Sequence, residues 1–180
     1  MTDEAKYEAA LRFAKLKHSG QFRKGGEPYV THPIAVAEIL KEKGYGTDYL
    51  ITGLFHDLLE DTDAKEEEIE ALGGKAVLKA VKLLTKHKGY VMAEYVSGIK
   101  SDPIAFAVKS ADRIHNLQSA FVTSEDFRRR YILETIDWYM DFSPEIPLAV
   151  RALAKSLSSP MHELELIYSP VEPDEHILNE

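Results

Sequence analysis

The chain has 180 residues, of which 44% are hydrophobic, and its formal net charge is −8. This length and composition predict a single globular domain with a full core. The negative charge argues against binding to nucleic acid, because the phosphate backbone would repel the chain. No apolar run reaches the ~20 residues of a membrane span, and the N-terminus has no secretory signal. The chain contains no cysteine, which excludes disulfides and thiolate ligands and fits a cytoplasmic location.

Apolar residues recur with helical spacing along most of the chain, and no segment alternates as a strand would. The predicted fold is therefore all-α, a compact bundle of many helices. Residues 1–168 are expected to form this domain, and residues 169–180, which hold two prolines and mostly polar side chains, a loose tail. The predicted helices cover residues 3–19, 33–43, 49–62, 63–73, 76–85, 90–100, 103–117, 125–141, 144–156 and 161–168.

Polar residues mark several of the expected helix starts. Asp48 is expected to cap the central helix, and Asp63 followed by Glu66 has the form of a capping box. Asp102 precedes Pro103, which combines a capping side chain with a proline in the first turn. These signals predict where the central helix and its neighbours begin.

The central helix carries the most unusual pattern in the chain. If it is continuous, His56, Asp57, Glu60 and Asp61 form one polar stripe, because successive residues turn by about 100°. The remaining circumference is apolar, so this helix belongs inside the protein, and the stripe contains no Lys or Arg to compensate its carboxylates. Gly53, one turn earlier, leaves room under the stripe. The pattern predicts part of a metal site; the alternative is the solvated face of an ordinary amphipathic helix.

The loop before the second helix is rich in glycine and proline and carries the adjacent cations Arg23 and Lys24. Such a cluster suits phosphate oxygens, but it is equally compatible with a solvated basic turn. His32 follows at the start of the next helix, where Thr31 or His32 is expected to cap, and where a histidine either packs locally or points into a cleft. The successive cations Arg128–Arg130 spread around their helix, which predicts a solvated face.

A second polar stripe interrupts the otherwise apolar helix after Pro103. Lys109, Asp112 and Asn116 share one face of that helix at spacings of three and four residues. On this spacing alone, the stripe is either a hydrogen-bonded network within the core or part of a functional site.

Taken in order, these motifs resemble the HD-domain phosphohydrolases, and in particular the alarmone hydrolase domain of the RelA/SpoT family. The resemblance covers about residues 5–140. The chain has no room for the synthetase domain of the long members of that family, and it is similar to small stand-alone hydrolases such as the metazoan SpoT homologues. Three segments carry the resemblance: HSGQFRKGGEPYVTHP at 18–33, HDLLEDT at 56–62 and KSADRIHNL at 109–117.

The resemblance implies three groups of site residues. The first ligates one divalent ion, which is Mn²⁺ in the family, although His and carboxylate ligands alone do not separate it from Fe²⁺ or Zn²⁺. The second orients or deprotonates the attacking water, and the third binds the substrate. In that order they are His32, His56, Asp57 and Asp112; Glu60 and Asp61; and Arg23, Lys24, Lys109 and Asn116.

The implied reaction removes pyrophosphate from the 3′ position of guanosine tetra- or pentaphosphate, so the expected partner is a small nucleotide. The chain departs from the family at Gly25, where Ser is common, and at Gln118-Ser119, where Arg-Thr is common near the nucleoside. The preference for guanine therefore stays open, as does a related 3′- or 2′-phosphorylated nucleotide. Two other interpretations are a general HD nucleotidase that releases orthophosphate and a domain that binds the alarmone without hydrolysing it.

Overall fold

The computed structural model describes residues 2–161 and residue 164. Over this part the fold is all-α, as predicted, and no helix within it is long and apolar enough to cross a membrane. The predicted helix at 161–168 and the tail at 169–180 lie outside the described residues, apart from Met161 and Leu164. The helices are α1 Asp3–Lys17, α2 Thr31–Glu42, α3 Thr47–Phe55, α4 Leu58–Asp61, α5 Glu66–Gly73, α6 Lys75–Leu84, α7 Met92–Lys100, α8 Pro103–Ser119, the 3₁₀ helix η1 Ala120–Val122, α9 Glu125–Trp138 and α10 Glu145–Ala154.

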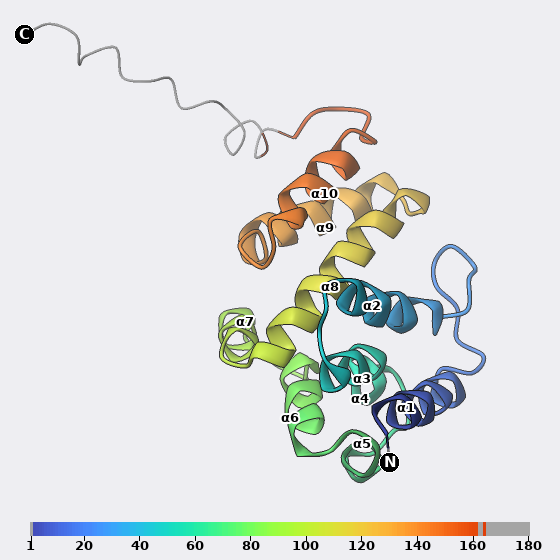
Figure 1. The fold of residues 1–180 in the computed structure, drawn as a ribbon. Helices are drawn as coiled ribbons and strands as arrows, with labels where there is room; N and C mark the ends of the chain where they lie inside the picture. The colour runs from blue at the N-terminus through green and yellow to red at the C-terminus, as the bar shows by residue number, and fades with distance from the viewer. Residues whose placement is uncertain (1, 162–163, 165–180) are drawn as a thin grey trace, which may run out of the picture.

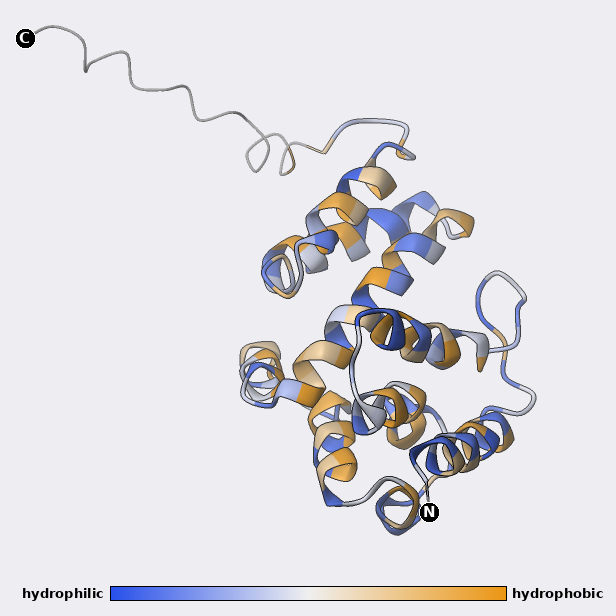
Figure 2. Ribbon diagram, viewed as in Figure 1, coloured by the Kyte–Doolittle hydropathy of each residue, from blue (hydrophilic) through white to orange (hydrophobic). Residues whose placement is uncertain are grey.

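Helix α8 is the axis around which the other helices are arranged (Figure 1). It packs against α2, α3, α6, α7 and α10. Helices α9 and α10 cover its C-terminal end, whereas α1, α5 and α6 gather around α3 at the other end. Figure 2 shows hydrophobic and hydrophilic residues alternating along helices such as α1 and α9, as expected for helices with one buried face.

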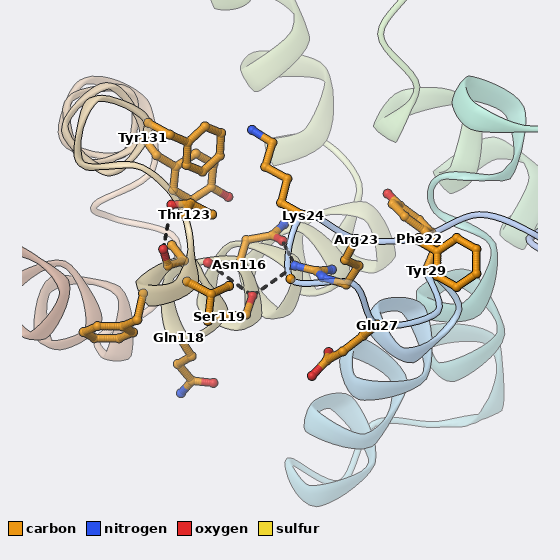
Figure 3. Close-up of a pocket in the computed structure, with 15 residues that line it drawn as sticks. Phe22, Arg23, Lys24, Glu27, Tyr29, Asn116, Gln118, Ser119, Thr123 and Tyr131 are labelled. Carbon is orange, nitrogen blue, oxygen red and sulfur yellow. Dashed lines mark hydrogen bonds between the residues drawn. The ribbon is translucent and has the colours of Figure 1, made fainter.

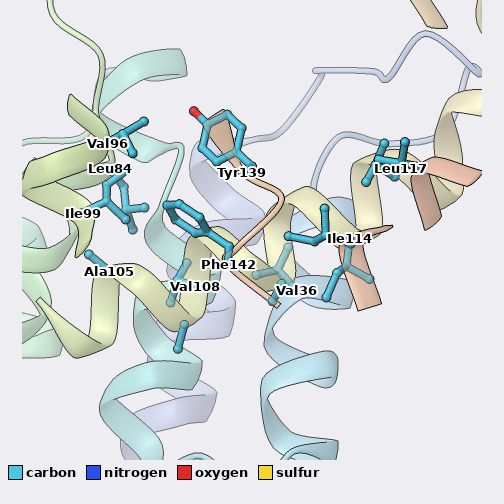
Figure 4. Close-up of a cluster of buried hydrophobic side chains, with 14 of the residues drawn as sticks. Val36, Leu84, Val96, Ile99, Ala105, Val108, Ile114, Leu117, Tyr139 and Phe142 are labelled. Carbon is cyan, nitrogen blue, oxygen red and sulfur yellow. The ribbon is translucent and has the colours of Figure 1, made fainter. Parts of the chain in front are cut away.

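Two hydrophobic clusters hold the bundle together. The larger one joins Val108, Ile114 and Leu117 of α8 to Tyr139 and Phe142 beyond α9 (Figure 4). The smaller one forms around α3, whose inward side chains contact small residues of α1. Residues 51–55 of α3 are buried and residues 47–50 half-buried, which confirms that the apolar stretch directly before the His-Asp pair lies inside the protein. The residues of this cluster are Ala10, Ala14, Ala37, Ile51, Leu54, Phe55, Leu58, Ile69, Val77 and Val81.

The central helix is not continuous, and this part of the sequence prediction is wrong. Helix α3 ends at Phe55, the pair His56 and Asp57 forms a turn, and the short α4 follows. His56 Nδ1 lies 2.8 Å from the carbonyl oxygen of Gly53, which the Asp57 amide would use in a continuous helix. Asp57 opens to φ −102° and ψ −2°. The turn thereby places both side chains of the pair at the end of a buried helix.

Two predicted caps are also wrong, because the acidic residues have found partners far away in the sequence. Asp48 lies within the first turn of α3 and pairs with Lys6 at 3.0 Å, while Gly46 precedes the helix. Asp63 pairs with Lys17 at 3.1 Å. The capping box lies two residues later than predicted: the Lys65 amide donates to the Glu68 carboxylate at 2.9 Å.

Helix α2 begins at Thr31, so neither Thr31 nor His32 is its cap, contrary to the sequence prediction. Val30 precedes the helix and offers no side-chain cap bond. The Thr31 hydroxyl instead donates to the carbonyl oxygen of Pro28 at 2.8 Å, which fixes the end of the loop. His32 is buried and is free to point toward the interior of the bundle.

Two of the three arginines in α9, Arg128 and Arg129, are not simply solvated, which corrects part of a further prediction, whereas Arg130 is exposed as predicted. The Arg128 guanidinium donates to the carbonyl oxygens of Phe121 and Ser156, each at 3.3 Å. Arg129 pairs with Glu125 at 2.9 Å and donates to the Ser159 carbonyl at 2.8 Å. These bonds fasten α9 to η1 and to the segment after α10.

The predicted cap of α8 is confirmed. Asp102 Oδ1 accepts from the amides of Ile104 and Ala105 at 3.0 Å each, and Asp102 Oδ2 lies 3.0 Å from Lys79 Nζ. Burial opposes ionisation of Asp102, but the Ala105 amide and the Lys79 ammonium outweigh it and lower the pKa of the carboxyl. The stabilisation is therefore present above the usual carboxyl pKa and is lost as the pH falls through the lowered value.

We expect Asp102→Ala to lower the free energy of unfolding by about 1 kcal/mol at pH 7, because α8 loses its cap and a partly buried ion pair. Denaturant titrations should show that the difference in free energy of unfolding between the variant and the parent becomes smaller as the pH falls below 3.8, the usual pKa of an aspartate. Lys100 pairs with the exposed Asp141 at 2.6 Å, so Asp141→Ala is a matched control with little expected effect. A stability difference that grows at acidic pH would contradict the role of the ionised Asp102 as the cap of α8.

Candidate metal centre and adjoining pocket

Four side chains from three parts of the fold converge between α2, α8 and the turn after α3. His32 Nε2 lies 3.1 Å from Asp112 Oδ1, and His56 Nε2 lies 3.0 Å from Asp57 Oδ2. The cross distances are 3.8 Å from His32 Nε2 to Asp57 Oδ2 and 3.7 Å from His56 Nε2 to Asp112 Oδ1. Asp57 has the most exposed of these side chains, at 21%. These are the four residues that the resemblance assigned to the metal.

The geometry suits a single divalent cation. Ligand atoms about 2.1 Å from one ion lie about 3 Å apart at adjacent octahedral positions, close to the shorter distances here. His32, His56 and Asp57 each offer a ligand atom within 4.8 Å of the others. His56 Nε2 is buried and makes no hydrogen bond of good geometry within the described residues, although Asp57 Oδ2 lies 3.0 Å away, which suits two groups that face a shared ion.

The electrostatics of the cluster point the same way. Burial alone would lower the pKa of His56, but the carboxylates of Asp57 and Asp112 outweigh it and raise that pKa to about 10. Burial likewise opposes ionisation of Asp57, yet the charge on His56 lowers the pKa of that carboxyl. Two buried carboxylates therefore attract positive charge to the imidazole nitrogen, which is where a dication would satisfy them.

Three neighbouring groups hold the carboxylates in place. Lys109 Nζ lies 2.8 Å from Asp112 Oδ2, and Asn116 Nδ2 donates to Asp112 Oδ1 at 2.6 Å. Tyr29 Oη donates to Asp57 Oδ2 at 2.7 Å. The polar stripe predicted on α8 therefore forms a hydrogen-bonded network around Asp112, next to the other three side chains of the cluster. Sequence reasoning missed Tyr29 as a site residue, although it falls within the first motif.

The Nδ1 atoms of the two histidines have different partners. The Nδ1 atom of His56 faces the Gly53 carbonyl, whereas that of His32 lies 2.8 Å from Nδ1 of His115. Burial, together with the charges of His32 and Arg23, lowers the pKa of His115 to about 4. His115 was not singled out from the sequence; its position three residues after Asp112, on the same face of α8, is the signal that could have found it.

The predicted catalytic carboxylates take different directions at the end of α4. Asp61 Oδ2 lies 3.1 Å from the Tyr29 hydroxyl, which also holds Asp57. Burial and the charge of Asp57 raise the pKa of Asp61. Glu60 instead accepts from the backbone amide of Lys86 at 2.9 Å. Both residues are exposed. The turn after α3 therefore divides the polar stripe that we predicted for one continuous helix.

A pocket of about 600 Å³ opens beside the metal cluster (Figure 3). Arg23 donates from one guanidinium nitrogen to Asn116 Oδ1 and to Ser119 Oγ, each at 3.0 Å. Lys24 Nζ lies 3.6 Å from the centre of the Phe127 ring. Both cations line the pocket, so they are not merely a solvated turn. Tyr29 lines it too and connects it to the metal cluster. The aromatic lining consists of Phe22, Tyr29, Phe121, Phe127 and Tyr131.

The loop that forms one wall of this pocket packs closely on η1. A Cβ atom added at Gly25 would lie 3.3 Å from Val122 Cγ2, so the glycine found here allows a close approach that a serine would crowd. Gln21 Nε2 donates to the Asp61 carbonyl at 2.7 Å, which fastens the loop to α4. Gln118, the other departure from the family pattern, is exposed and lines the same pocket.

Comparison with known proteins agrees with this geometry. Residues 10–94 match the HD domain family. The chain is 34% identical over 180 residues to a guanosine-3′,5′-bis(diphosphate) 3′-pyrophosphohydrolase of Aquifex aeolicus, covering 96% of this chain and 25% of that protein. It is 35% identical over 166 residues to the bifunctional (p)ppGpp synthase/hydrolase SpoT of Escherichia coli, covering 86% of this chain and 23% of that one. The chain thus spans about a quarter of the length of these curated relatives.

A solved structure shares the fold. It is that of a metazoan ortholog of SpoT, a protein described as hydrolysing ppGpp and as playing a role in starvation responses. The TM-score is 0.70, with 26% sequence identity, and the match covers 84% of this chain and 94% of that one. Residues 10–94 therefore carry the match to the HD domain family, and the shared fold extends over most of the chain. Of these similar proteins, the one from Aquifex aeolicus is named for ppGpp hydrolysis, the one from Escherichia coli for both (p)ppGpp synthesis and hydrolysis, and the metazoan one is described as hydrolysing ppGpp.

The spacing between the two histidine-bearing elements depends on Gly53. A Cβ atom there would lie 3.0 Å from Leu40 Cδ1 and 3.3 Å from the Ala37 amide nitrogen, so the glycine makes room for α2 rather than for the polar stripe. We expect Gly53→Ala to destabilise the protein by about 1–3 kcal/mol, because it forces α2 away from α3. Denaturant unfolding measures this change.

Gly98→Ala in α7 is the matched control. A Cβ atom there would lie 3.4 Å from Leu83 Cδ2, an ordinary contact. This substitution should raise the stability by about 0.5–1 kcal/mol, because alanine favours the helix. Equal gains in both variants would show that α2 and α3 are not closely packed at Gly53.

Proposed function

We propose that the protein hydrolyses the 3′-pyrophosphate of guanosine tetra- and pentaphosphate, with GDP or GTP and pyrophosphate as products. The observation that carries the proposal is the convergence of four metal-type ligands beside a pocket lined by Arg23 and Lys24. The names of the relatives support the same reaction. The pocket sits in the bundle that holds the ligands, so a nucleotide bound there would present its phosphates to the centre.

The proposed metal is Mn²⁺, held by His32, His56, Asp57 and Asp112. When bound, a dication lowers the pKa of a water molecule and polarises the phosphorus centre. The two carboxylates balance its charge, and Lys109 offsets part of the charge of Asp112. This leaves net positive charge at the centre, which favours an anionic substrate.

Asp61 and Glu60 are the proposed acid–base groups. Asp61 shares the Tyr29 hydroxyl with Asp57, so it is next to the metal without being one of its four ligands. Burial and the charge of Asp57 raise the pKa of Asp61, which makes it a better proton acceptor than an ordinary aspartate. Glu60 is exposed one residue earlier and would receive or relay the proton.

On the substrate side, Arg23 and Lys24 are the proposed phosphate contacts. The aromatic part of the pocket would receive the nucleoside. Lys109 and Asn116, predicted to bind the substrate, contact Asp112 directly, and Asn116 also accepts from Arg23. We therefore propose that Lys109 acts mainly on the ligand and that Asn116 connects the ligand to the phosphate-binding arginine.

The test of the reaction is a panel of nucleotides incubated with Mn²⁺ and analysed by product identity. We expect pyrophosphate from guanosine 3′,5′-bis(diphosphate), and no orthophosphate from nucleoside monophosphates, because the cationic loop sits beside the metal centre. Orthophosphate as the main product would favour a general nucleotidase. Binding without any product would favour a sensing domain and overturn the proposal. The panel also decides the base preference left open by Gln118.

Two isosteric variants separate metal binding from proton transfer. Asp112→Asn removes a charged ligand, so Mn²⁺ affinity and turnover should fall together. Asp61→Asn keeps the four ligands, so Mn²⁺ affinity should stay near that of the parent while kcat falls by about 10²-fold or more. Titration calorimetry with Mn²⁺ and steady-state kinetics measure the two effects, with the exposed Asp141→Asn as a control. Parental turnover in Asp61→Asn would refute its assignment.

A further inference from the structure

His115 has no place among the ligands, the proton-transfer groups or the phosphate contacts described above, yet it lies at the centre of the site. It projects from α8 three residues after Asp112, and its Nδ1 atom lies 2.8 Å from Nδ1 of His32. The two rings are 4.9 Å apart, with an angle of 34° between their planes. The backbone around His115 is fixed, because Ser119 Oγ donates to its carbonyl oxygen at 2.8 Å.

The direction of this hydrogen bond follows from the geometry of His32. A histidine that ligates through Nε2 carries its proton on Nδ1. His32 Nε2 faces Asp57 and Asp112, so its Nδ1 must donate, and His115 Nδ1 must accept. The reverse direction would leave His32 with a proton on Nε2, directed into the cluster, and would prevent it from ligating.

We propose that His115 is a positioning residue that fixes the tautomer and the ring orientation of His32 for metal binding. The inference rests on the proposed metal centre and not on the identity of the nucleotide. It assigns His115 the role that a carboxylate or a backbone carbonyl commonly has behind a ligating histidine. His56 has the common arrangement, with the Gly53 carbonyl as its acceptor.

A neutral acceptor behind His32 has an electrostatic consequence. Asp57 and Asp112 already supply two negative charges to the centre, and Lys109 returns one positive charge. A third carboxylate behind His32 would make the ligand more basic and the cation more tightly held, but it would also cancel the positive charge left for an anionic substrate. A neutral imidazole orients His32 and leaves the positive charge of the centre unchanged.

Three substitutions at this position form a matched series, because each places one atom at the δ position that Nδ1 now occupies. His115→Asn offers a neutral oxygen acceptor, His115→Asp a charged one, and His115→Leu a methyl group that cannot accept. The probe is Mn²⁺ alone, titrated calorimetrically into metal-free protein. His87→Leu, an exposed histidine on the loop after α6, is the control for loss of an imidazole elsewhere.

We expect Mn²⁺ affinity to fall by about 10- to 100-fold in the leucine variant, to stay close to the parent in the asparagine variant, and to rise in the aspartate variant. A merely structural role would not produce rescue by asparagine together with a gain from aspartate. If the leucine variant fails to fold, the asparagine and aspartate variants still decide the question. Parental affinity in folded His115→Leu, or a loss in folded His115→Asn as large as that expected for leucine, would overturn the inference.

These results are separable from a failure of the proposed function. If the parent protein binds no Mn²⁺, the metal centre itself is refuted. If the parent binds Mn²⁺ and the series shows no ordered response, only the role of His115 is refuted. Circular dichroism of each metal-free variant establishes that affinities are compared between folded proteins.

Discussion

The structure depends on placing two carboxylates, Asp57 and Asp112, inside a protein without enough permanent positive charge to balance them. Buried anions are stable only when paired, and the side chains around them supply one permanent positive charge, the ammonium of Lys109. The second charge comes from a proton that the two carboxylates attract to His56, and a bound cation would take the place of that proton. Helix α8 concentrates these charges, because one of its faces carries Asp112, the Lys109 ammonium that pairs with it and the Asn116 amide that donates to it. That face is held against α2 and α3 by the hydrophobic contacts on the other sides of α8.

Much of the arrangement could be predicted because it depends on local signals. The helical spacing of apolar residues was enough for the fold class, and the cap at Asp102 was found because its partners are the next amides along the chain. The proposed metal ligands could not be predicted from local signals. His32 and Asp112 are separated by 80 positions, and spacing alone did not decide whether His32 packs locally or faces a cleft, or whether Asp112 belongs to a core network or a functional site. The resemblance joined them, and the structure brings their side chains together.

The errors at Asp48, Asp63 and Arg128 share one physical origin, which is competition from partners that are distant in the sequence. Asp48 and Asp63 have the composition of caps, but lysines of α1 pair with them instead. Arg128 looks like a solvated charge until the chain returns after α10 and offers it a carbonyl oxygen. The break after α3 is subtler, because the His56 ring faces a carbonyl that a helix would use for its own backbone. Periodicity records only the face of a helix on which a side chain lies. It cannot detect that a side chain has replaced a backbone amide as the partner of a carbonyl oxygen.

The contacts of Arg23 have a consequence for how selective the pocket is. One terminal nitrogen of its guanidinium donates to Asn116 and Ser119, which are both neutral acceptors. A guanidinium carries five N–H groups, so these two bonds hold the planar group in one orientation and leave the other three N–H groups for an incoming oxyanion. Hydrogen bonds from this cation to a charged oxygen are about twice as strong as neutral ones, so a phosphate would gain more from them than an uncharged ligand. Orientation of the arginine before any ligand arrives thus lowers the entropic cost of binding a polyanion.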